Sequence, residues 1–60
     1  MKEIEIANYA RRLFEEHGAK AIAFAAQRLR GAEEKRDSEE ADQWRRIEIA
    51  LKEMRGPRET

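Results

Sequence analysis

The sequence contains no cysteine, and no long hydrophobic run interrupts its polar residues. Without cysteine the chain forms neither disulfides nor thiolate metal sites. Its apolar stretches are all far shorter than the roughly 20 residues that a membrane-spanning helix requires. Residues 1–5 include two glutamates, where a secretory signal peptide needs a basic start and then an apolar run. We therefore expect a soluble protein that stays in the cytoplasm and has no membrane partner.

The sequence also lacks an excess of charge of one sign, because 13 lysines and arginines balance 13 aspartates and glutamates. No net field draws the whole molecule to nucleic acid or to an anionic membrane. Charged residues make up 43% of the chain, and alanine is prominent among the apolar 40%, a composition that favours helix. A chain of 60 residues has room for one domain with a thin core, and such domains are marginal without a ligand or a second chain.

The few glycines and the single proline divide the chain into an all-α domain of three predicted helices, at about 2–17, 19–35 and 38–55. Gly18 suits the left-handed conformation that follows the last turn of a helix. Asp37 is a good N-cap residue, and Glu40, three residues after it, resembles the acidic half of a capping box. The predicted third helix ends before Gly56.

Two further expectations concern the limits of this domain. We expect a single domain over 1–56 and a disordered tail over 57–60, since Gly56-Pro57 stops a helix. The alternative fold is one continuous helix over 19–55, because residues 32–36 are all good helix formers. That alternative would give a two-helix hairpin, which could bury its apolar face only in a dimer.

Large apolar residues recur at steps of three and four, which predicts one buried face on each helix. The predicted core residues are Ile6, Tyr9, Leu13, Phe14, Ile22, Leu29, Trp44, Ile47, Leu51 and Met54. Three others, Ile4, Phe24 and Ile49, do not fit these faces, because Phe24 points about 200° from Ile22 at 100° per residue. Isolated apolar residues on a surface need no explanation. Alternatively, the three form a second apolar surface that binds another protein or a second copy of the chain.

Arg28 flanks the predicted inner face of the second helix, beside alanines that let another helix approach. Its planar guanidinium suits a partly buried ion pair with a carboxylate such as Asp37 or Glu53. We add Arg28 to the predicted partner interface of Ile4, Phe24 and Ile49.

The sequence offers few groups for catalysis or for metal binding. His17 is the only histidine, and it lacks a nucleophile or a second catalytic group placed near it. The adjacent Glu15 and Glu16 diverge from it on a helix, so they do not form a ligand pair at a spacing of three or four. We expect His17 to cap the carbonyl end of the first helix and to interact favourably with the helix dipole. We predict no enzymatic activity, no catalytic or metal site and no cofactor.

The predicted function is a non-enzymatic helical interaction module that forms a homodimer or binds another protein. Nucleic-acid binding is the alternative function, because arginines occur in the pairs Arg11-Arg12 and Arg45-Arg46. A short helical domain with a basic helix is a common DNA-binding arrangement. However, acidic residues surround the second pair, and the stretch 35–40 is too long and acidic for the turn of a helix-turn-helix. Surface ion pairs at helical spacing are the competing interpretation of these arginines.

The chain also resembles a family of short, uncharacterised alphaproteobacterial proteins. The resemblance covers roughly residues 7–54 and rests on His17-Gly18, Ala21, Ala25-Ala26, Arg28, Asp37, Trp44-Arg45-Arg46-Ile47, Ala50 and Glu53. It implies a bacterial, cytoplasmic three-helix protein and brings no activity with it. Members of that family usually have a glycine just before the aspartate, whereas this chain has Arg36, and the difference favours the continuous-helix alternative.

Overall fold

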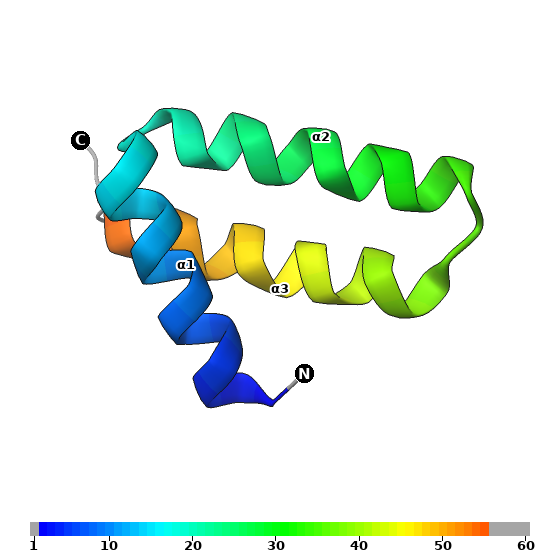
Figure 1. Cartoon of the computed structure of the whole chain (residues 1–60), viewed down its shortest axis with the longest axis horizontal. Helices are drawn as coiled ribbons and strands as arrows, with labels where there is room; N and C mark the ends of the chain where they lie inside the picture. The colour runs from blue at the N-terminus through cyan, green and yellow to red at the C-terminus, as the bar shows by residue number, and fades with distance from the viewer. Residues whose placement is uncertain (1, 56–60) are drawn as a thin grey trace.

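The computed structural model describes residues 2–55, which form three helices: α1 (Glu3–His17), α2 (Lys20–Glu34) and α3 (Ser38–Arg55) (Figure 1). The prediction of an all-α, three-helix fold is confirmed, with each boundary within one residue of its expected position. The predicted tail over 57–60, together with Gly56, lies outside the described residues. Between residues 2 and 55, no helix is long and apolar enough to cross a membrane.

The helices pack as an antiparallel pair with a third helix across one end. α2 and α3 lie side by side along the longest dimension, and α1 crosses the end of the pair where α2 begins (Figure 1). α2 and α3 make the most extensive contact, and α1 packs more on α3 than on α2. The hairpin of α2 and α3 therefore extends beyond α1 at its loop end.

The junction between α1 and α2 forms at Gly18, as the sequence predicts. Gly18 has a positive φ of 61°, and its N–H donates to the carbonyl of Phe14 at 2.7 Å. Its own carbonyl accepts from the N–H of Ala21 at 3.0 Å, which begins the next helix. Because residues with a Cβ rarely adopt this conformation, glycine is required here.

The continuous-helix alternative is wrong, because the chain reverses at residues 35–37. Arg36 has a φ of 60°, the left-handed conformation that ends a helix. The N–H of Arg36 donates to the carbonyl of Glu33 at 3.0 Å, and the N–H of Asp37 donates to that of Ala32 at 2.9 Å. These two hydrogen bonds form a Schellman motif, which satisfies carbonyls that the end of a helix would leave free.

Asp37 then begins α3 in the way that the sequence predicts. Its Oδ1 accepts from the backbone N–H of Glu40 at 3.1 Å, which is the hydrogen bond of an N-cap. The N–H of Asp37 itself is bonded to Ala32, so Glu40 does not complete a capping box. The hairpin is thus fixed from both sides, by the end of α2 and by the start of α3.

The core lies where all three helices meet. Of the predicted core residues, Ile6, Leu13, Ile47 and Leu51 are buried. Five more are half-buried and pack against them: Tyr9, Phe14, Ile22, Trp44 and Met54. The prediction for Leu29 is wrong, because this half-buried residue lies outside the core cluster. Near the loop end, α2 and α3 meet without α1, and alanines at 32 and 41 are the buried residues there.

Alanine supplies the buried face of α2, which is rotated from the predicted one. Ala21 and Ala25 are fully buried, whereas Ile22 and Ala26, one residue further along, are half-buried. A shift of one residue corresponds to a rotation of about 100°. Because a methyl side chain lets two helix backbones approach closely, α2 turns its alanines toward its neighbours and leaves Ile22 at the side.

Candidate protein-interaction surface

Ile4 and Ile49 are the most exposed large apolar residues of the described chain, with 68% and 53% of their surface accessible. Ile49 lies 200° around α3 from both Ile47 and Leu51 at 100° per residue. These two neighbours are almost completely buried. The packing of α3 therefore forces Ile49 to face away from the core.

Ile49 borders a groove between α1 and α3. The residues that line this α1–α3 groove are Glu3, Ile6 and Ala7 of α1 and Arg46, Ile49, Ala50 and Glu53 of α3. Ile6, Ala7, Ile49 and Ala50 provide apolar surface, and the two acids and the arginine provide charge. Ile4 does not line the groove, although it follows Glu3 directly in the chain.

Phe24 does not belong to this surface, so its prediction as an outward-facing residue is wrong. Its side chain is half-buried and packs against the core. The Phe24 ring lies edge-on to Trp44, with ring centres 6.0 Å apart, and stacks on His17 at 5.8 Å. The rotation of α2 explains this placement, because it brings Phe24 from the outer face to the side facing α1 and α3.

Tyr9 extends this contact into an aromatic cluster shared by all three helices. The centres of the Tyr9 and Trp44 rings lie 5.8 Å apart in an edge-to-face arrangement. Such pairs contribute about 0.5–1.5 kcal/mol beyond the area that they bury. Sequence reasoning placed Tyr9 and Trp44 in the core but missed the cluster, because the partners come from three different helices.

Arg28 does not form the predicted ion pair with Asp37 or Glu53. Its side chain is exposed, and the guanidinium carbon lies 5.1 Å from the centre of the Phe24 ring. Asp37 instead caps α3. The spacing of four residues between Phe24 and Arg28 could have indicated this contact from the sequence, since such residues are neighbours on a helix.

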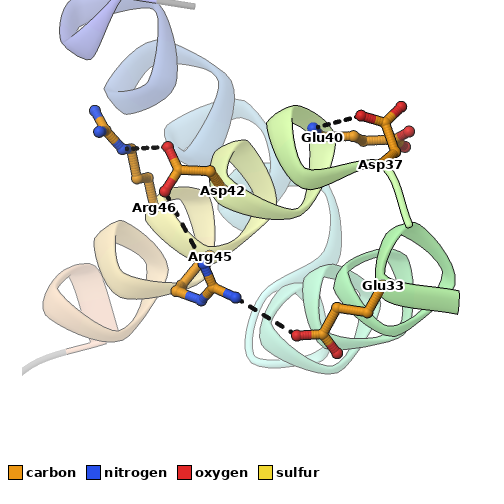
Figure 2. A network of polar contacts seen from close by, with 6 residues as sticks. All are labelled: Glu33, Asp37, Glu40, Asp42, Arg45 and Arg46. Atoms are coloured by element: carbon orange, nitrogen blue, oxygen red, sulfur yellow. Dashed lines mark hydrogen bonds and ion pairs between the residues drawn. The ribbon is translucent and has the colours of Figure 1, made fainter. Parts of the chain in front are cut away.

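Arg45 and Arg46, the second arginine pair, lie within a network of carboxylates (Figure 2). Arg45 reaches Glu33 of α2 at 3.5 Å and Asp42 at 3.9 Å, and the Nε of Arg46 lies 3.1 Å from Asp42. All four side chains are about half exposed, so each pair contributes at most about 1 kcal/mol. The network places negative charge beside both arginines, which weakens them as phosphate ligands.

His17, the single histidine of the sequence, contacts one carboxylate and one aromatic ring. The Nε2 of His17 lies 3.8 Å from a carboxylate oxygen of Glu16, and its ring stacks on Phe24. His17 ends α1, where a basic side chain interacts favourably with the helix dipole. Across residues 2–55, no group of three histidine, aspartate or glutamate side chains is arranged to hold a metal ion.

Comparisons with protein-family models, curated proteins and solved structures find no match to this chain. Membership of the alphaproteobacterial family therefore stays a prediction.

Proposed function

We propose that the chain is a cytoplasmic, non-enzymatic helical module that binds a protein through its α1–α3 groove. The observation that carries this proposal is the exposure of Ile49, at 53%, beside apolar surface from both helices. Full burial of an exposed isoleucine contributes about 1.5–3 kcal/mol, and Ile49 is 53% exposed, so a partner that covers it gains roughly half of this, about 0.8–1.5 kcal/mol.

The shape of the groove supports a helical partner. An amphipathic helix carries apolar side chains at spacings of three and four residues along one face. A groove between two helices can accept that row of side chains. Ala7 and Ala50 present only methyl groups, so the backbone of a partner helix can approach closely there. Charged residues at the edges of the groove, Glu3, Arg46 and Glu53, would set the orientation of that partner.

Site-specific photo-cross-linking tests the proposal. A photoreactive phenylalanine derivative replaces Ile49 in one variant and Ala23 in a control, and both are expressed in the cells that naturally make the protein. Ala23 is a suitable control because it is exposed on α2 and does not line the groove. We expect a discrete covalent adduct from position 49 and none from position 23. Equal labelling from both positions, or no adduct from position 49, would contradict the proposal.

A further inference from the structure

We infer that Gly18 is a hinge that selects between two arrangements of this chain. One is the monomer described above, and the other is an exchanged dimer, in which each copy packs its α1 on the α2–α3 hairpin of the other copy. The inference does not depend on the proposed function. It comes from the backbone between α1 and α2, where one residue separates two helices that could be continuous.

Gly18 is the one residue between α1 and α2 whose backbone is not helical. Its φ is 61° and its ψ is −138°, whereas Ala19 has a φ of −62° and a ψ of −22°, which are angles of a right-handed helix. A change in the two backbone angles of Gly18 would therefore join α1 and α2 into one straight helix over residues 3–34. The neighbouring glutamates, alanines and lysine at 15, 16 and 19–21 are good helix formers.

The bend also leaves a backbone donor that a straight helix would use. The N–H of Ala19 donates to no backbone carbonyl in the described part of the chain. The N–H groups of Ala21 and Ile22 donate three residues back, at 3.0 and 3.3 Å, instead of four. In a straight helix, Ala19 would donate to Glu15, and the bonds that begin α2 would take the α-helical spacing. Straightening therefore improves the local hydrogen bonding.

A straight helix cannot keep α1 on its own hairpin. It would be about 48 Å long at 1.5 Å per residue, whereas the longest dimension of the molecule is 35 Å. α1 contributes Ile6, Ala10 and Leu13 to the core and packs more on α3 than on α2. A straightened chain would expose these three side chains together with Ile47 and Leu51 of α3. A second straightened copy has the same α1 and the same hairpin, so the two can restore each other's core by exchanging α1.

The residue at position 18 decides between the two arrangements, because the contacts within the core are the same in both. Glycine favours the monomer, since it accepts the bend without strain and is a poor residue inside a helix. Alanine has both preferences reversed. It is strained at a φ of 61° and is the best helix former.

Sedimentation equilibrium of the full chain, from micromolar to millimolar concentration, tests the inference. We expect Gly18→Ala to dimerise about 30-fold to 10⁴-fold more tightly than the wild type, because exchange relieves the backbone strain of two chains. Gly31→Ala is the matched control, since it adds the same methyl group inside α2, where a Cβ meets nothing within 4 Å. It should associate no more than the wild type.

A synthetic chain with D-alanine at position 18 is the second control. For a D-residue, a φ of 61° with a ψ of −138° is the mirror image of an ordinary extended conformation, so the bend carries no strain. This chain has the same side chain as Gly18→Ala and should behave as the wild type does.

The distance between two spin labels within one chain distinguishes exchange from simple association. Asn8→Cys and Glu34→Cys provide exposed attachment sites in a chain that has no other cysteine. A labelled Gly18→Ala chain is refolded with an excess of unlabelled Gly18→Ala, so that each dimer holds one labelled copy. In a straight helix these positions lie about 39 Å apart, beyond the 35 Å length of the monomer. We expect about 39 Å in Gly18→Ala and a shorter distance at Gly18.

A Gly18→Ala chain that remains a monomer at millimolar concentration would overturn the inference. So would one that circular dichroism shows to be unfolded, because the exchanged dimer keeps the same core without strain. A dimer whose labels stay within 35 Å would show association without exchange, and equal dimerisation of either control would show that the hinge is not the cause. None of these results depends on a cross-link from Ile49, so the proposed function is tested separately.

Discussion

Replacing Arg36 by glycine should stabilise the protein. Arg36 occupies the position after the end of α2 where the Schellman motif requires a left-handed residue, and its φ is 60°. A residue with a Cβ loses about 1–2 kcal/mol in this conformation, and glycine does not. The side chain of Arg36 is exposed, so its removal leaves no cavity.

The expected change in the free energy of unfolding is the strain removed from the folded state minus the freedom gained by the unfolded chain. Glycine removes the backbone strain, but it also gives the unfolded chain more freedom, which offsets about 0.4–1 kcal/mol. The middle of these two ranges gives a net gain in the free energy of unfolding of about 0.8 kcal/mol, within limits of about 0 and 1.6 kcal/mol. For a domain of this size, 1 kcal/mol raises Tm by roughly 4–8 °C, so we expect an increase of about 2–8 °C.

Thermal and urea unfolding, followed by the fluorescence of Trp44, measure this change. Trp44 is the only tryptophan, and it lies between Tyr9 and Phe24, so its emission reports the packing of all three helices. Arg36→Ala is the control, because alanine also lacks the guanidinium but keeps the Cβ and the strain. If Arg36→Gly stabilises no more than Arg36→Ala, backbone strain at this position is not the cause.

Four further experiments test other parts of the structure. Gly31→Ala should stabilise the protein by about 1 kcal/mol, because this glycine lies inside a helix and a Cβ there meets nothing within 4 Å. Gly18→Ala should destabilise the protein by about 1–3 kcal/mol, because Gly18 has a positive φ. Urea titrations that show the same effect for both variants would contradict this. Asp37→Ala should cost about 1 kcal/mol, and Asp37→Asn, which keeps the cap, should recover most of it. Leu51→Ala should cost about 2–5 kcal/mol because Leu51 is completely buried, and it should leave little folded protein by circular dichroism. Fluorescence anisotropy with duplex DNA at about 50 mM salt should show no binding, because carboxylates already engage Arg45; tight binding that weakens as salt rises would support the nucleic-acid alternative.

Helix boundaries could be predicted from the sequence because each one depends on local backbone chemistry. Gly18 ends α1 through its own φ, and Asp37 begins α3 through a hydrogen bond three residues away. The left-handed conformation of Arg36 could not be predicted in the same way, since arginine disfavours it. In the structure, the φ of Arg36 and the two hydrogen bonds back to α2 show that the helix ends there.

The sequence predicts the orientation of a residue of the candidate site correctly only where that orientation depends on a single helix. Ile49 faces outward because its own neighbours on α3 are buried, which periodicity indicates. The orientation of α2 depends instead on how closely it approaches α3. Ala21 and Ile22 are both apolar, and either could lie on the inner face of α2. The periodicity of large side chains favours Ile22, whereas the structure buries Ala21, so the predicted inner face of α2 is rotated from the observed one. The misplaced Phe24 follows from this rotation, whereas Arg28 was misplaced because its contact with Phe24, four residues earlier on the same helix, was not considered.

The three-residue turn between α2 and α3 has a consequence for the order of folding. The most extensive packing in the molecule joins two helices that are consecutive in the chain, so it forms at a small cost in loop-closure entropy. Such local contacts are typical of helical proteins that fold within microseconds to milliseconds. We expect the α2–α3 hairpin to form first and α1 to dock afterwards. Because α1 supplies one side of the α1–α3 groove, the proposed binding surface would then be completed only in the last step of folding.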